Sequence, residues 1–178
     1  MSDGYEEDLA MYGESAGAKP RVLDNEVLLR PISSLRYPKK PLSVASSSPA
    51  KDALARMTEK RIGAVLVVDD GRVVGIFTER DALMKGLYAG GDINAPVSEY
   101  MTADPDCLTP HDPIAFAMNR MGLGGYRHMP LVDGEHRPVG MLVMRDVVRY
   151  IAAFFPAEAL NLPPHSEHDP PERNIHGG

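Results

Sequence analysis

The sequence predicts an α+β fold in which two β-α-β-β-α repeats pack as a pseudo-twofold pair. The chain matches itself at an offset of 64 residues, which becomes 65 after a single turn. Both copies show the same succession of capping residues, apolar runs and turn residues. A unit of roughly 60 residues buries too little surface to be comfortably stable alone, so we expect the two copies to cover each other's open sheet faces, with clefts between them.

The internal repeat can be followed position by position. The matches keep their order along the chain, and the one-residue slip falls inside a predicted turn, which indicates a duplicated unit. The identical pairs are Pro41/Pro105, Pro49/Pro113, Ala53/Ala117, Arg56/Arg120, Met57/Met121, Val68/Val132, Asp69/Asp133, Val74/Val139, Gly75/Gly140, Arg80/Arg145 and Asp81/Asp146.

Each unit opens with a short extended piece, residues 42–44 or 106–108, and continues into a helix. Ser48 and Asp112 are the predicted N-caps, and the proline after each suits the first helical position, where a missing N–H costs nothing. Apolar residues then recur at i, i+1 and i+4, which places one buried stripe on each helix. The stripes consist of Ala53, Leu54 and Met57 in the first helix and Ala117, Met118 and Met121 in the second.

A β-hairpin and a second helix complete the unit. Residues 64–68 are apolar and rich in β-branched side chains, which is typical of a buried strand. Asp70 and Gly71 form a strong hairpin turn signal, and residues 72–77 form the returning strand. The second helix is predicted to begin near Thr78.

The domain organisation follows from the repeat and from the two tails. We expect an acidic N-terminal tail over residues 1–29, the first repeat over 30–92, the second over 93–156 and a Pro-rich C-terminal tail over 157–178. Residues 1–26 carry seven acids and two bases, so most of the net charge of −6 belongs to the N-terminal tail. The nearly neutral body has no basic stripe, which argues against nucleic-acid binding.

Composition narrows the class of protein further. The single Cys excludes an internal disulfide framework and a cysteine-based zinc cluster. The acidic start lacks the apolar stretch of a signal peptide, and no apolar run approaches the roughly 18 residues of a spanning helix, so we expect a cytoplasmic protein. The single thiol, Cys107, is interpreted either as a small buried hydrophobe or as a reactive group.

Residues 75–81 of the first repeat are the first candidate site. They run from a strand into a helix N-terminus, where backbone N–H groups and the helix dipole favour an anion. Asp81 is able to accept hydrogen bonds from two ribose hydroxyls, and Thr78 is able to bond a hydroxyl or a phosphate oxygen. Gly75 would admit a ligand close to the backbone. Thr78 and Asp81 are also suited to an ordinary capping box, so a structural interpretation stays open.

The second copy of this heptad, residues 140–146, keeps the acid as Asp146 but has Val143 in place of the threonine. Because valine cannot cap, the retained Asp is harder to explain as half of a capping box. The second repeat also places Arg127 and His128 at the entrance to its first strand, and both residue types suit phosphate. The alternative for this pair is a solvated arginine beside a strand-end histidine.

Together these features resemble a tandem pair of CBS domains, the Bateman module. The resemblance rests on the doubled unit, the Gly-x-x-Thr-x-x-Asp heptad after a hairpin and the Arg-His-Met-Pro-Leu-Val-Asp run of the second copy, and it spans roughly residues 30–156. It implies a sensor that binds AMP, ADP, ATP, NAD(H) or S-adenosylmethionine in a cleft between the repeats. Such pairs often form homodimers.

The resemblance also implies a role for each matching residue. Asp81 would hold the ribose, with Thr78 at the ribose–phosphate end. Arg127 and His128 would reach the phosphates from the opposite repeat. The residues expected against the adenine are Ser43, Val44, Ala45 and Ile76.

A twin cleft, centred on Asp146, departs from the family pattern. Val143 replaces the hydroxyl residue, and Gly63 and Ala64 stand where basic side chains would be wanted. We therefore expect this second cleft to be weak or empty.

The expected function is that of a stand-alone regulatory module with an adenine nucleotide as its regulatory ligand, without metal, cofactor or catalytic role. The sequence shows no Ser-His-Asp, metal-ligand or P-loop pattern. The module would signal to an effector protein or through a homodimer. The apolar helix stripes are expected to face partly outward and to pack between the two chains of the homodimer. The alternative is a CBS-fold interaction scaffold that has lost ligand binding.

Overall fold

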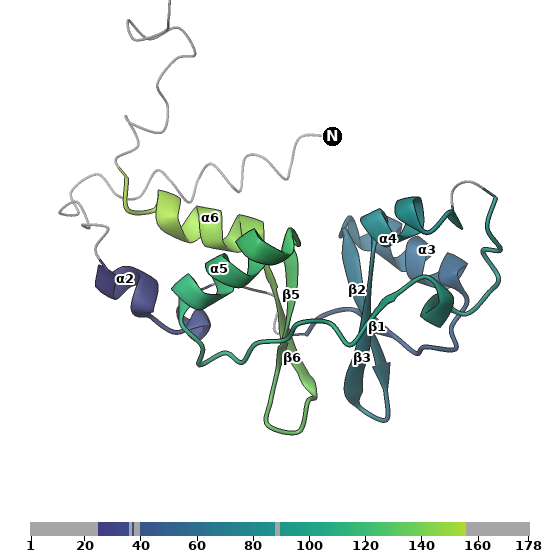
Figure 1. Ribbon diagram of the computed structural model, residues 1–178, viewed down its shortest axis with the longest axis horizontal. Coiled ribbons are helices and arrows are strands. Elements are labelled where there is room, and N and C mark those ends of the chain that lie inside the picture. The colour runs from purple at the N-terminus through teal and green to yellow at the C-terminus, as the bar shows by residue number, and fades with distance from the viewer. Residues whose placement is uncertain (1–24, 36, 38–39, 88–89, 156–178) are drawn as a thin grey trace, which may run out of the picture. The chain divides into compact units, whose positions relative to one another are not determined.

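The structure is a computed structural model that describes residues 25–155 apart from 36, 38–39 and 88–89 (Figure 1). Residues Asp24–Val148 form one compact unit, and the described residues from Arg149 onward belong to another. Among the described helices, none is long and apolar enough to cross a membrane. The elements are α2 (Asn25–Leu29), η2 (Ile32–Ser34), β1 (Ser43–Val44), α3 (Ala50–Lys60), β2 (Ala64–Asp69), β3 (Arg72–Thr78), α4 (Glu79–Met84), η4 (Val97–Glu99), β4 (Thr102–Ala103), α5 (Ile114–Gly124), β5 (His128–Val132), β6 (Pro138–Val143) and α6 (Met144–Ala152).

The predicted β-α-β-β-α order and the α+β class are confirmed. The first sheet has the order β1-β2-β3-β4, with β1 parallel to β2 and the other neighbours antiparallel, while β5 and β6 form a two-stranded antiparallel sheet. The β2–β3 turn contains Asp70 and Gly71, with φ angles of 49° and 75°, the left-handed values that a tight hairpin turn of this kind requires. In the second repeat the opening piece contributes only a bridge between Leu108 and Leu131.

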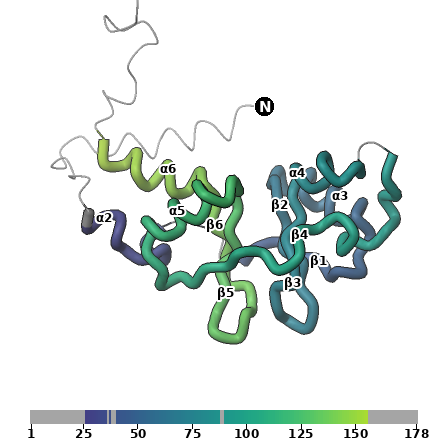
Figure 2. The backbone as a smooth tube through the Cα atoms, in the orientation of Figure 1, coloured from purple at the N-terminus to yellow at the C-terminus, as the bar shows by residue number. Residues whose placement is uncertain are grey.

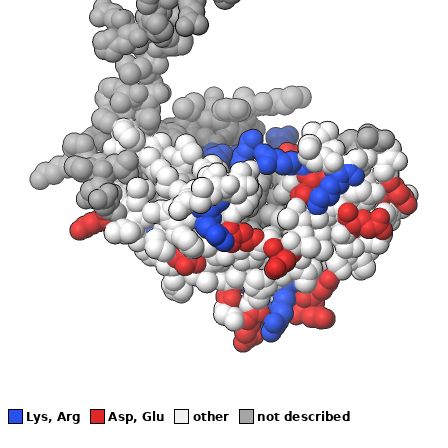
Figure 3. All heavy atoms as spheres, in the orientation of Figure 1, with Lys and Arg blue, Asp and Glu red and all other residues white. Residues whose placement is uncertain are grey.

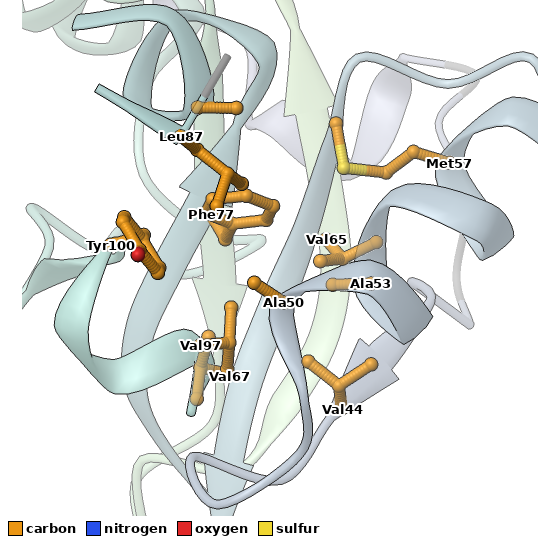
Figure 4. Packing of buried hydrophobic residues seen from close by; sticks show 11 residues of the cluster. Val44, Ala50, Ala53, Met57, Val65, Val67, Phe77, Leu87, Val97 and Tyr100 are labelled. Carbon is orange, nitrogen blue, oxygen red and sulfur yellow. The ribbon is translucent and has the colours of Figure 1, made fainter. Parts of the chain in front are cut away.

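The core of the first repeat lies between α3 and the β2–β3 hairpin (Figure 4). Phe77 and Val65 are fully buried there. In the two helix stripes, four of the six predicted residues are buried, so the stripes pack mainly inward and only Leu54 and Met118 are partly exposed. The four buried residues are Ala53, Met57, Ala117 and Met121.

The predicted helix caps differ from those in the structure. Helices α3 and α5 begin one residue later than expected, with the two prolines at the N-cap position and no side-chain cap. Instead, the amides of Ala50 and Lys51 donate to the carbonyls of Ala95 and Ile93, both at 2.9 Å. Asp112 accepts from the amide and the hydroxyl of Thr109. Backbone carbonyls from a distant segment therefore satisfy the first amides of α3.

The segment that leads into each repeat packs against the other repeat. The first lead-in, residues 30–35, meets the start of α5, where Ile114 donates to Arg30 and Ile32 donates to Asp112, both at 2.9 Å. The second lead-in, residues 93–103, meets the start of α3 in the same way. The side chains of Ile32 and Val97 are fully buried. The boundaries of the sequence repeats therefore differ from the boundaries of the segments that pack together.

This exchange brings strands of the two repeats together. Within the second lead-in, β4 pairs with β3 of the first repeat (Figure 2). A separate apolar cluster joins the two hairpins, as expected for two units that cover each other's sheet faces. Its buried members are Ala64, Leu66, Val73 and Ile76 from the first repeat and Val132 and Met141 from the second.

Candidate functional site

A cavity of about 500 Å³ opens where β3 passes into α4, beside β4 and the start of β5. We call it the Asp81 cleft. Its lining combines residues of both repeats with the second lead-in. The lining residues are Gly63, Ile76, Thr78, Glu79, Arg80, Asp81, Thr102, Asp104, Pro105, Asp106, Gly124, Tyr126, Arg127 and His128.

Five of the eight predicted ligand-binding residues line this cleft, and three lie elsewhere. Ser43 and Val44 form β1, at the opposite edge of the sheet from β4, and Ala45 follows them. Val44 is buried in the core of the first repeat. The cleft is bordered instead by Thr102, Asp104, Pro105 and Asp106, because β4 occupies the sheet edge beside β3. The five residues in the cleft are Ile76, Thr78, Asp81, Arg127 and His128.

Asp81 forms a complete capping box with Thr78. The Asp81 amide donates to the Thr78 hydroxyl oxygen at 3.1 Å, while the Thr78 amide donates to Asp81 Oδ2 at 3.0 Å. The Thr78 hydroxyl also lies 2.6 Å from Oδ2. The structural interpretation of this pair is therefore correct, and any ligand contact would be an additional role.

The second carboxylate oxygen of Asp81 is also occupied. Oδ1 accepts a hydrogen bond from the Thr102 hydroxyl at 2.8 Å and lies 3.1 Å from the Lys85 ammonium. The same ammonium donates to the carbonyl oxygen of Met101. Asp81 and Lys85 thus fasten the second lead-in to α4 of the first repeat. A ribose that binds Asp81 must displace or share these partners.

The predicted anion site at the start of α4 is largely taken up by the protein. The Glu79 amide donates to the Gly63 carbonyl at 3.1 Å, and the Asp81 amide belongs to the capping box. The helix has only six residues. A phosphate in this cleft would consequently depend on side chains, chiefly Arg127 and Arg80, and not on helix amides.

Gly75 makes room for a protein side chain. A Cβ at this position would collide with the thioether of Met101, which comes from the second lead-in. At the counterpart Gly140, a Cβ would lie 2.6 Å from the ring of Tyr37. Each glycine therefore admits a side chain from the segment that precedes the first helix of the other repeat, and the predicted close approach of a ligand to Gly75 is not available.

His128 is partly buried beside charged neighbours of both signs. Burial is the main cause that lowers its pKa, aided by Arg127 and Arg145, while Glu79 and Asp146 act in the opposite direction. At neutral pH its imidazole is consequently mostly uncharged and offers hydrogen bonds without a positive charge.

In the second heptad, the retained Asp has a structural role of its own. Asp146 Oδ2 accepts a hydrogen bond from the Val143 amide at 3.1 Å, which is the half of a capping box that needs no hydroxyl. Gly63 lines the Asp81 cleft, and Ala64 is buried in the cluster between the hairpins. The four residues expected around a twin cleft are therefore divided among different environments.

A neighbouring cavity of about 760 Å³ shares five lining residues with the Asp81 cleft. Its wall contains Asp106, which pairs with Arg120 at 2.7 Å and accepts from the Tyr126 hydroxyl. Arg120 lowers the pKa of Asp106, and burial raises the pKa of Cys107 to about 11. A neutral thiol at physiological pH fits the interpretation of Cys107 as a small hydrophobe.

Several cleft residues escaped the sequence analysis. Thr102 has a proline as its repeat counterpart, so no repeat pattern marked its hydroxyl. Lys85 lies four residues after Asp81, a helical spacing that predicts an ion pair. Glu79 and Asp104 reach the cleft only through the tertiary fold. Within the described ranges, no group of three metal-ligating side chains is present.

Charged side chains of both signs are interspersed on the face shown in Figure 3. The acids and bases gather there without forming a continuous basic stripe. This pattern agrees with the nearly neutral charge of the sequence outside the N-terminal tail.

Comparison with known proteins identifies one family in both repeats. The family described as "CBS domain" matches residues 33–87 and 97–153. An uncharacterized 17.7 kDa protein of Acidianus ambivalens is 34% identical over 99 residues, which cover 55% of this chain and 59% of that protein. The matches span 59%, 14% and 37% of the first three curated relatives, so the chain corresponds to only part of their length.

Solved structures share the fold. A protein with CBS domains from Burkholderia ambifaria is 31% identical, with a TM-score of 0.62 over 68% of this chain and 91% of that one. A CBS domain protein from Pyrobaculum aerophilum, complexed with AMP, is 22% identical, with a TM-score of 0.58 over 66% and 88%. A CBS domain pair in complex with 5′-methylthioadenosine and S-adenosyl-L-methionine is 24% identical, with a TM-score of 0.59 over 65% and 94%.

Proposed function

This chain belongs to the CBS-domain family, and on that premise we propose that it is a regulatory module whose Asp81 cleft binds an adenosyl ligand. The observation that carries the proposal is the meeting of Ile76, Thr78 and Asp81 with Arg127 in one cleft. These residues come from both repeats, so a ligand here would contact both at once. The candidate ligands are AMP, ADP, ATP, NAD(H) and S-adenosylmethionine.

The cleft suggests an arrangement for such a ligand. The ribose would replace Thr102 and Lys85 at Oδ1 of Asp81, and the phosphate end would point toward Arg127. The base would lie between Ile76 and the second lead-in near Pro105, in place of residues 43–45. Adenosyl ligands bound to two proteins of the same fold support the ligand class, although those likenesses are of fold alone.

A regulatory role would follow from the contacts that the ribose displaces. Thr102 and the Met101 carbonyl belong to the second lead-in, and both are tied to α4 through Asp81 and Lys85. Exchanging these bonds for ligand bonds alters how the lead-in is held against the first repeat. The ligand-free and ligand-bound states would then differ in the contacts of the second lead-in, and a partner protein would bind one state more tightly than the other. No catalytic step is part of this proposal.

The alternative is an interaction scaffold without a ligand. It is favoured by the capping box, which accounts for Thr78 and Asp81 without any bound molecule. Both functions predict the same fold, so only a binding measurement separates them.

A ligand panel tests the proposed function. Thermal-shift and calorimetric titration with AMP, ATP, NADH and S-adenosylmethionine should identify at least one ligand that binds with one molecule per chain. A ligand at 100 times its Kd should stabilise the protein by about 2.7 kcal/mol. Two equal sites per chain would contradict the asymmetry of the two heptads, and no binding by any ligand would favour the scaffold.

We also propose a homodimer, with an interface different from the stripes predicted by the sequence. Leu83 and Met84 on α4 are 64% and 77% exposed, and Val148 on α6, the repeat counterpart of Leu83, is 56% exposed. Exposed apolar residues at equivalent positions suit a two-fold interface. Light scattering should give twice the chain mass of 19.4 kDa.

A charge in this surface tests the interface. Leu83→Glu should convert the dimer to a monomer at micromolar concentration, whereas Leu123→Glu on α5, where the side chain is 82% exposed, should leave it dimeric. A monomeric wild-type protein, or dissociation by both substitutions alike, would contradict the proposed interface.

A further inference from the structure

We propose that the Asp81 cleft selects adenosyl ligands of low negative charge, with at most one phosphate, and that Glu79 is the residue that sets this limit. The inference rests on the proposed function, because it concerns the ligand of the same cleft. It narrows the candidate class from all adenine nucleotides to nucleosides, monophosphates and cationic adenosyl compounds.

The first support is the position of Glu79 at the phosphate end of the cleft. A Cβ built on Gly63 would lie 3.4 Å from Glu79 Oε2 and 3.5 Å from His128 Cε1. Glu79 and His128 thus flank the same point of the cleft wall. His128 is one of the two residues expected to receive phosphate, so a phosphate that reaches it also approaches a carboxylate.

The second support is the balance of charge in the cleft. Asp106 is paired with Arg120, and Asp81 with Lys85. The remaining acids, Glu79 and Asp104, are matched in number by the cations Arg80 and Arg127. A polyphosphate therefore meets no surplus of positive charge.

Of these two cations, only one is available without breaking a hydrogen bond to the protein. Arg80 Nη1 donates to the Gly125 carbonyl at 2.9 Å. Within the described part of the chain, Arg127 forms no ion pair. One cation suits one phosphate, and each further phosphate would add negative charge near Glu79.

An acid at this position is not required by the fold. The counterpart of Glu79 in the second repeat is Met144, which begins α6 without a negative charge. A first-turn acid does stabilise a helix N-terminus, and that general effect is the competing explanation of Glu79. The two explanations differ in what they predict for ligands of different charge.

The test compares ligand charge in wild-type protein and in Glu79→Gln. Calorimetry at constant ionic strength and without divalent cations gives Kd for adenosine, AMP, ATP and S-adenosylmethionine. Wild type should bind AMP about tenfold or more tightly than ATP. Glu79→Gln should raise ATP affinity about tenfold, leave adenosine within twofold and weaken the cationic S-adenosylmethionine severalfold. Glu59→Gln, an exposed acid on α3 outside the cleft, is the matched control.

The outcomes separate this inference from the proposed function. If adenosyl ligands bind but wild type prefers ATP, or if Glu79→Gln changes all four affinities equally, the charge selection is wrong and the proposed function stands. If none of the four ligands binds the folded wild-type protein, the proposed function fails and the inference fails with it. Opposite shifts for ATP and S-adenosylmethionine are not expected from a helix-stabilising role.

Discussion

Replacing Asp81 by asparagine is expected to weaken binding of the best adenosyl ligand by about 10- to 100-fold. A carboxylate that accepts two ribose hydroxyls makes charge-assisted hydrogen bonds worth roughly 1.5–3 kcal/mol. Asparagine keeps the shape of the side chain but removes its charge and one of its two acceptor oxygens. The measurement is Kd by calorimetry, with the melting temperature of each ligand-free variant beside it.

Two variants separate a ribose contact from a purely structural role of Asp81. Thr102→Val removes the hydroxyl that donates to Oδ1, so it disturbs the same network and spares the carboxylate. Asp146→Asn makes the same chemical change in the second heptad. If Asp81 holds the ribose, only Asp81→Asn should lower the affinity tenfold or more. Equal and small effects of all three variants would leave Asp81 as a cap and favour the scaffold.

Features encoded by neighbouring residues were predictable from the sequence. The turn at Asp70 and Gly71 follows from the left-handed backbone that this hairpin requires, and the strands on either side carry their own β-branched pattern. The capping box of Thr78 and Asp81 is equally local, since its four groups lie within one helical turn. The repeat then extended the predicted order of elements to the second copy, in which Val143 leaves only half of the capping box.

Features that depend on distant segments were not predictable in this way. The resemblance implied that the base lies near residues 43–45. In the structure these residues lie at the sheet edge formed by β1, whereas β4 from the second lead-in forms the edge beside β3, so Thr102 and Pro105 border the cleft instead. A signal was present in Gly75 and Gly140, since a glycine in a strand often marks a close approach. Their sequence context does not reveal that Met101 and Tyr37 are the groups that approach.

The N-caps of the helices were also not predictable from neighbouring residues alone. Ser48 and Asp112 are good N-cap residues by type, and each precedes a proline. Tertiary hydrogen bonds replaced the side-chain cap of α3, because carbonyls of the second lead-in reach the amides of Ala50 and Lys51. No local rule anticipates donors satisfied by a segment more than forty residues away.

The exchange of lead-ins leads to the second large effect, which concerns Ile32. Ile32→Ala should lower the free energy of unfolding by about 2–5 kcal/mol, since it removes a fully buried side chain from a packed site. We expect the second repeat to be destabilised, although Ile32 belongs to the lead-in of the first. Its amide donates to Asp112, and Pro31 forms a bridge with Pro113 at the start of α5.

Hydrogen exchange under native conditions locates the effect. For Ile32→Ala we expect faster exchange of the amides of α5 and unchanged exchange in α3, because local opening reports on nearby packing. Val97→Ala is the matched control, and it should accelerate α3, since Val97 packs in one cluster with Ala50 and Ala53. Faster exchange in α3 upon Ile32→Ala would mean that each lead-in stabilises its own repeat.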